Sequence, residues 1–215
     1  MTSDLWLLLA LTLFAGAASP GPSLALVIRS SLVHGRSAGV LVGLAHGLGV
    51  WLYALAVVLG VATLLVGNPW LLSSIQIAGV VFLAYLGSMM LRAGIAASRA
   101  TEPPEQPLIA STDTEQRPAI SFLRDGFLIV FLNPKIVVFF LAIFSQFLTA
   151  EQALATQFTA ASLAGIIDAM WYVFVALLVS NAAIANRLQR YSGPIDMLFG
   201  LLLLAVASLI LIGIL

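Results

Sequence analysis

Apolar residues run in six long stretches along the chain, separated by shorter polar segments. Each stretch has about the 20 residues that a helix needs to cross the roughly 30 Å hydrocarbon core of a bilayer. Membrane strands would instead be about ten residues long and would alternate in polarity. The pattern therefore predicts six transmembrane helices, at approximately residues 5–28, 38–62, 70–92, 122–148, 155–180 and 194–214.

Composition supports a membrane-embedded chain. Of the 215 residues, 61% are apolar and 8% are charged, whereas soluble domains have roughly 45–50% and 25%. Nine basic and nine acidic residues are too few to cover a soluble fold of this length without large apolar patches. The formal net charge of zero leaves no basic field to attract nucleic acid, and the absence of cysteine excludes disulfides and thiolate metal sites.

Eight basic residues fall in or beside alternate connections between the apolar stretches. The connections around residues 68 and 151, and both termini, carry no basic residue. The positive-inside rule assigns the basic side to the cytoplasm, so both termini are expected on the opposite side of the membrane, outside. The eight residues are Arg29, Arg36, Arg92, Arg99, Arg117, Arg124, Arg187 and Arg190.

The longest connection, residues 93–121, divides the chain into two halves. Its four prolines stand among Glu, Gln, Ser and Thr, and it has too little apolar surface to offset the entropy of ordering. We expect a flexible cytoplasmic linker between a repeat at residues 1–92 and a repeat at residues 122–215. Because each half has three helices, the repeats would be inverted in the membrane. The predicted fold is an all-α integral membrane protein of two inverted three-helix repeats.

The leading helix of each half is interrupted by proline. Pro20, Gly21 and Pro22 break the first apolar stretch, and Asn133 and Pro134 break the fourth. Proline removes a backbone donor and clashes with the preceding turn, so carbonyls lose partners where lipid cannot replace them. A single break is commonly a simple kink. Breaks in corresponding positions of both halves instead indicate the central site of a transporter.

Two charged residues are expected deep in the membrane. Lys135 lies about halfway along the fourth stretch, and Asp168 lies near the middle of the fifth. An ammonium group at the bilayer centre costs at least ~2.5 kcal/mol, so Lys135 needs an anionic partner, a substrate carboxylate or a route to water. Asp168 is the expected counter-charge. The alternative is a static ion pair that only fixes helix packing.

Other donors also fall within the predicted helices rather than at their ends. His46 has an unperturbed pKa of about 6.5, which suits a coupling proton. A neutral histidine bonded to a neighbouring helix is an equally good interpretation. Trp51, Tyr53, Trp171 and Tyr172 carry hydroxyl or indole donors that need partners, which makes them candidates for lining a cavity.

Small residues recur at every fourth position in the second helix of each half. Such stripes let another backbone approach closely, within one chain or between the chains of a homo-oligomer. His46 and Asp168 each stand one position from a stripe. The stripes are Gly35, Gly39, Gly43 and Gly47 in the first half and Ala161, Gly165 and Ala169 in the second.

Motifs for catalysis are absent from the sequence. There is no His-Glu-x-x-His pair, serine elbow or phosphate loop. Two histidines with a single carboxylate deep in an apolar stretch make a poor metal site. We therefore expect a protein that is not an enzyme and that needs no metal or other cofactor.

The chain resembles the LysE/RhtB family of bacterial amino-acid exporters. The resemblance rests on the Pro-Gly-Pro motif within residues 19–23, the glycine-rich second helix and the Asn-Pro-Lys motif at residues 133–135. It spans nearly the whole chain except the linker. It implies export of amino acids or close derivatives across the inner membrane, driven by the proton gradient, and it supports six helices.

The resulting hypothesis is a secondary transporter with its site between the two broken helices. An amino acid would bind at Pro20, Gly21, Pro22, Asn133, Pro134 and Lys135, and protons would exchange at Asp168 and His46. The alternatives are a channel or a carrier for another small solute or cation, a membrane-embedded enzyme, and a structural or receptor-like bundle.

Overall fold

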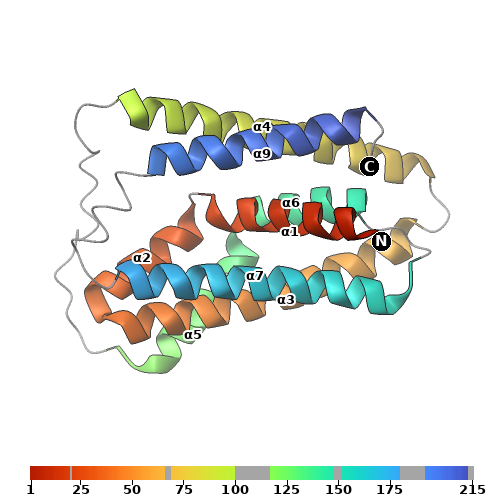
Figure 1. Cartoon of the computed structure of the whole chain (residues 1–215). Coiled ribbons are helices and arrows are strands. Elements are labelled where there is room, and N and C mark those ends of the chain that lie inside the picture. Colours follow the sequence, from red (N-terminus) through yellow and green to blue (C-terminus); the bar gives the residue numbers. More distant parts are fainter. Residues whose placement is uncertain (20, 66–68, 100–116, 148–151, 180–191, 213–215) are drawn as a thin grey trace.

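The computed structural model describes residues 1–19, 21–65, 69–99, 117–147, 152–179 and 192–212, and the regular structure in these ranges is helical (Figure 1). Pro20, Arg187, Arg190 and linker residues 100–116 lie outside the described residues. The helices are α1 (Ser3–Ala18), α2 (Pro22–His34), α3 (Arg36–Leu65), α4 (Pro69–Arg99), α5 (Ala119–Leu132), α6 (Pro134–Phe147), α7 (Leu154–Val179) and α9 (Ser192–Leu211).

Four of these helices, α3, α4, α7 and α9, are long and apolar enough to cross a membrane, which confirms four of the predicted spans. The pair α1 and α2 makes a fifth if it forms one span bent by 60°. The predicted fourth stretch is divided between α5 and α6, so the count of six remains a prediction. Helix α4 continues past Arg92 to Arg99, because the added segment is rich in alanine and contains no proline.

Both proline motifs begin new helices. Helix α1 ends at Ala18, and α2 starts at Pro22 after an extended Gly21. In the second half, Asn133 is extended and Pro134 is the first residue of α6. Proline suits this position because its fixed φ is helical and its missing N–H would have no helical partner there. The interruptions are therefore true helix breaks rather than kinks in continuous helices.

The glycine stripe of α3 packs against the small-residue stripe of α7, so the backbone that approaches each stripe belongs to the same chain. A Cβ added at Gly47 would lie 2.5 Å from the Cβ of Ala169, and one added at Gly43 would lie 3.1 Å from backbone and Cβ atoms of Tyr172. A Cβ at Gly165 would lie 2.6 Å from that of Trp51. This close contact makes the second helix of each half central to the bundle.

The remaining helices surround this central pair (Figure 1). Helix α3 also contacts α2 and α5, whereas α4 and α9 pack side by side as a second group. Helices α1 and α6 lie between the two groups, with α6 against α4 and α1 against both α7 and α9. Helix α1 begins at the same end of the molecule at which α9 ends.

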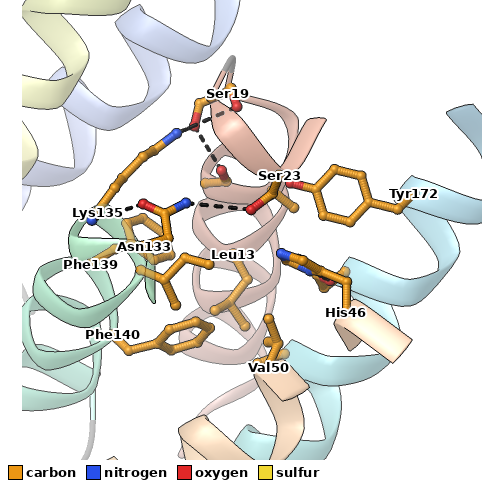
Figure 2. Close-up of a pocket in the computed structure, with 16 residues that line it drawn as sticks. Leu13, Ser19, Ser23, His46, Val50, Asn133, Lys135, Phe139, Phe140 and Tyr172 are labelled. Atoms are coloured by element: carbon orange, nitrogen blue, oxygen red, sulfur yellow. Dashed lines mark hydrogen bonds and ion pairs between the residues drawn. The ribbon is translucent and has the colours of Figure 1, made fainter. Parts of the chain in front are cut away.

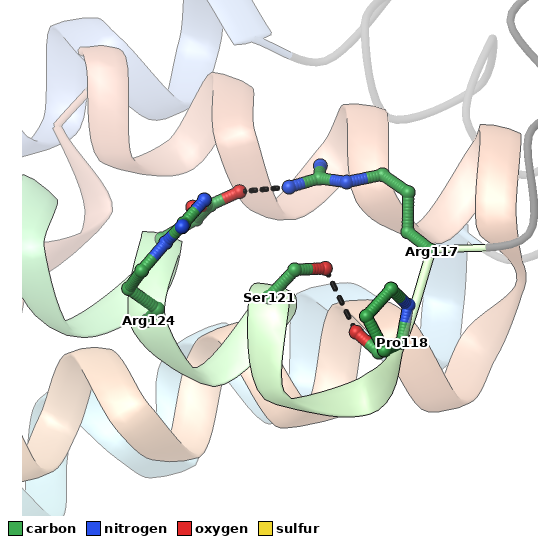
Figure 3. Close-up of polar contacts among 5 residues, drawn as sticks. Arg117, Pro118, Ser121 and Arg124 are labelled. Atoms are coloured by element: carbon green, nitrogen blue, oxygen red, sulfur yellow. Dashed lines mark hydrogen bonds and ion pairs between the residues drawn. The ribbon is translucent and has the colours of Figure 1, made fainter.

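A cluster of polar contacts marks the start of α5 (Figure 3). Arg117 donates through Nη2 to Oδ2 of Asp125 at 2.5 Å, and Arg124 donates to Oδ1 of the same carboxylate at 3.2 Å. The Ser121 hydroxyl donates to the carbonyl of Pro118 at 2.8 Å. Residues 119–121, which the sequence analysis placed in the linker, are therefore part of α5.

Candidate functional site

A pocket lies where the two helix breaks meet (Figure 2). It is enclosed by the end of α1, the start of α2, the start of α6 and the middle of α3 and α7. Its volume of about 40 Å³ is room for one or two water molecules. The lining residues are Leu13, Gly16, Ala17, Ser19, Gly21, Ser23, His46, Val50, Asn133, Lys135, Ile136, Phe139, Phe140, Ala164, Asp168 and Tyr172.

Asn133 joins the two breaks. Its side-chain Oδ1 accepts a hydrogen bond from the backbone N–H of Lys135 at 3.1 Å, which caps the N-terminus of α6. Its Nδ2 donates to Oγ of Ser23, in the first turn of α2, at 3.4 Å. The side chain is buried at 6% exposure. One amide group therefore holds the beginnings of both half-helices at the pocket.

Lys135 reaches across the pocket to the end of α1 (Figure 2). Its ammonium group donates to the hydroxyl of Ser19 and, at 3.4 Å, to the Ser19 carbonyl. Ser19 is the C-cap of α1, so this cation lies at backbone that the first break has released from the helix. Lipid cannot supply a hydrogen-bond partner to such backbone, and the ammonium group of Lys135 supplies one.

The deepest polar contact of the pocket joins α3 to α7. Nδ1 of His46 and Oδ2 of Asp168 are 2.6 Å apart, and the two residues are only 1% and 6% exposed. The ring of Tyr172 packs edge-on against the imidazole, with centroids 4.7 Å apart. The Nε2 atom of His46 has no hydrogen-bond partner among the described residues.

This geometry corrects the expected pairing of charges. Asp168 forms its ion pair with His46 rather than with Lys135, within the part of the chain that the structure describes. The physical reason is the contact between Gly47 and Ala169, which places the neighbouring residues His46 and Asp168 at the same level of the bundle. His46 is thus bonded to a neighbouring helix, as one of its two interpretations predicted, and its role in carrying a coupling proton stays a prediction.

Asp196 of α9 is the charged residue that the sequence analysis missed. It is 8% exposed and interacts electrostatically with Lys135. It stands near the start of the last apolar stretch, where a solvated acid at a helix end is ordinary. Its position inside an apolar stretch could have marked Asp196 as a candidate site residue, because very few acidic residues of this chain lie in such stretches.

Of the four candidate aromatic residues, Tyr172 lines the pocket and the other three do not. Trp51 donates through Nε1 to Oγ of Ser162 at 3.3 Å, a contact between α3 and α7. Tyr53 packs beside two phenylalanines, and Trp171 packs edge-on against Phe14. Trp51 and Trp171 therefore contribute to helix packing, and Tyr53 packs against Phe140, which itself lines the pocket.

The arrangement is suited to binding charge and moving protons. A cation lies on one wall and an acid–base pair lies on another, with apolar side chains between them. Within the described ranges, no group of three or more His, Cys, Asp or Glu residues is placed so that it could hold a metal ion.

Comparison with known proteins identifies relatives along most of the chain. Residues 14–213 match the family described as LysE type translocator. The chain is 32% identical to the uncharacterized membrane protein YahN of Escherichia coli K12, over 82% of this chain and 77% of that protein. It is 25% identical to the threonine efflux protein of the same strain, over 89% and 90% of the two chains.

A leucine efflux protein of Klebsiella pneumoniae is 28% identical over 60% of this chain and 56% of its own length. No solved structure matches. The apolar helices and the family agree on a multi-pass bacterial membrane protein. The chain belongs to the LysE type translocators, which are transporters rather than enzymes.

Proposed function

We propose that this protein exports amino acids or close derivatives across the bacterial inner membrane in exchange for protons. Two of the relatives are named as efflux proteins, for threonine and for leucine. The observation that carries the proposal is the buried pair of His46 and Asp168 in a pocket formed by two helix breaks. Intramembrane ionisable residues are costly, and they mark substrate and proton pathways.

Substrate would bind between the two breaks. The N-termini of α2 and α6, at Gly21 and Pro22 and at Asn133 and Pro134, offer positive dipole ends for a carboxylate, and Lys135 adds a full charge. Pro20 would contribute by keeping the first break open. A pocket with room for one or two water molecules is too small for an amino acid, so binding of the substrate would require the pocket to widen.

Protons would act through the pair of His46 and Asp168. Nε2 of His46 belongs to a pocket-lining side chain, so a proton can arrive there from water in an open state. Gain or loss of that proton changes the charge of the wall against which the substrate lies. Coupling follows because a ligand drives transport only if it binds the two access states with different affinities.

We also propose six membrane crossings in two inverted repeats. In this arrangement the broken pair α1 and α2 corresponds to the broken pair α5 and α6, α3 corresponds to α7, and α4 corresponds to α9. The support is that both α2 and α6 begin with proline. In addition, α3 contacts α5 and α6, just as α7 contacts α1 and α2. In this arrangement residues 93–121 would include the cytoplasmic linker, and both termini would be outside.

The test is transport by the purified protein in liposomes with an imposed pH gradient, using a panel of amino acids that includes threonine and leucine. We expect saturable uphill movement of at least one amino acid, and loss of that movement when the gradient is collapsed. Transport that is indifferent to the gradient would exclude proton antiport. A flux that never saturates and never runs uphill would indicate a channel.

The variant Asp168→Asn tests whether Asp168 couples transport to the pH gradient without preventing the protein from folding. This change keeps the shape of the side chain, so we expect inserted protein that no longer responds to the pH gradient. Asp125→Asn is the matched control, because it removes a carboxylate whose partners Arg117 and Arg124 lie outside the pocket. Equal transport by both variants and the parent would refute the role of Asp168.

A further inference from the structure

Asp196 presents an unusual electrostatic situation on α9. The residue is 8% exposed, and no hydrogen bond or direct ion pair joins its carboxylate to another residue that the structure describes. Burying an ionised carboxylate in this way is costly unless something compensates its charge. The group that interacts with it electrostatically is Lys135, which is hydrogen-bonded to Ser19.

Packing between α1 and α9 places Asp196 on the Ser19 side of the pocket. The two helices are antiparallel (Figure 1), and the rings of Phe14 and Phe199 meet edge-on with centroids 5.3 Å apart. About one turn from that contact, α9 presents Asp196, and in the same direction along α1 the chain reaches Ser19. The carboxylate therefore lies toward the end of α1 that Lys135 contacts.

The two charges interact electrostatically, and no direct ion pair joins them within the described residues. Lys135, which is partly buried, belongs to α6, and Asp196, which is 8% exposed as a residue, belongs to α9. We infer that Lys135 and Asp196 form a two-charge subsite beside the pocket, which binds the carboxylate and the ammonium group of an α-amino acid zwitterion. The inference rests on the proposed function and deepens it, because it names Asp196 as a residue that recognises the substrate's ammonium group.

Charge balance explains why a zwitterion fits this subsite. The substrate carboxylate would meet Lys135 and the substrate ammonium would meet Asp196, so the four charges alternate in sign and their sum stays zero. An amino-acid amide would bring a net positive charge into the membrane, and a hydroxy acid would bring a net negative one. Both analogues leave one protein charge without a partner, which is the costly outcome in a desolvated site.

The experiment measures how three compounds inhibit transport by the full-length protein in liposomes. They are L-leucine, leucinamide and the hydroxy acid analogue of leucine, or the same three derivatives of threonine if threonine is the better substrate. For the parent we expect the zwitterion to bind roughly tenfold or more tightly than either analogue. Asp196→Asn should weaken the zwitterion by a similar factor and let the hydroxy acid bind more tightly than it binds the parent, because no carboxylate is then left without a partner. Asp196→Glu should restore part of the preference.

Selectivity distinguishes recognition from a structural role. If Asp196→Asn weakens all three compounds equally, or lowers only the maximal rate, the subsite is refuted. Parental selectivity in this variant refutes it as well. If the Asn variant does not accumulate in the membrane, Asp196→Glu replaces it, and an unchanged KM for the zwitterion is then the refuting result. Asp125→Asn again serves as the control that should change nothing.

The same data separate this inference from the proposed function. A parent protein that transports leucine or threonine without discriminating against the two analogues overturns the subsite alone. A parent protein that transports none of the amino acids in the panel overturns the proposed function and the subsite with it.

Discussion

Replacement of Gly47 by alanine tests whether the contact between α3 and α7 holds the proton pair together. The added Cβ would lie 2.5 Å from the Cβ of Ala169 and 2.9 Å from its Cα and N atoms. Ordinary van der Waals contacts of such atoms begin near 3.4 Å. Since two of these atoms belong to the backbone, rotation of a side chain cannot relieve the clash. The helices must separate by about an ångström at this level.

The consequence reaches His46 directly, because it is the residue before Gly47. A separation of this size would lengthen the 2.6 Å contact between His46 and Asp168 to roughly 3.5 Å, at the limit of a hydrogen bond. Overpacking costs about 1–3 kcal/mol, and loss of a buried charged hydrogen bond costs about 1.5–3 kcal/mol. We therefore expect Gly47→Ala to lower both the unfolding midpoint in detergent and the transport driven by a pH gradient.

Gly60→Ala is the matched control for this experiment. Gly60 lies on the same helix, and a Cβ added there would meet nothing within 4 Å. Both variants gain the same methyl group and the same helix propensity, so the difference between them isolates the packing contact. An unfolding midpoint and a transport rate for Gly47→Ala that equal those of Gly60→Ala would refute the reasoning.

Two further experiments test the helix break and the orientation. Asn133→Ala removes the cap of α6 and should cost about 1 kcal/mol of stability, while Asn133→Ser, which can still cap, should cost less. Thermal unfolding in detergent measures both, and equal midpoints would contradict the capping role. Because the chain has no cysteine, single cysteines in place of Asn68 and Ala110 can report orientation. An impermeant thiol reagent on intact cells should label position 68 and not position 110, and the opposite pattern would reverse the predicted orientation.

The sequence alone predicted the long helices and the two helix breaks, because these features depend on residues that are close together in the chain. The lengths of the apolar stretches predicted α3, α4, α7 and α9, because a helix in lipid satisfies its own backbone within one segment. The motifs at Gly21–Pro22 and Asn133–Pro134 predicted the two breaks for the same local reason, since proline acts on the turn that contains it. The residues around these breaks line one pocket.

The partners of the charged groups depended on the packing of distant helices. The glycine stripe of α3 indicated that another backbone approaches, but its contact with Ala169 requires a register between helices more than a hundred residues apart in the chain. That register pairs Asp168 with His46 and leaves Lys135 to Ser19 and Asp196. Electrostatic energy depends on distances of a few ångströms, and the rotation and sliding of one helix against another set those distances. The sequence specifies neither the rotation nor the sliding of one helix against another, so only the tertiary structure decides which charged groups become partners.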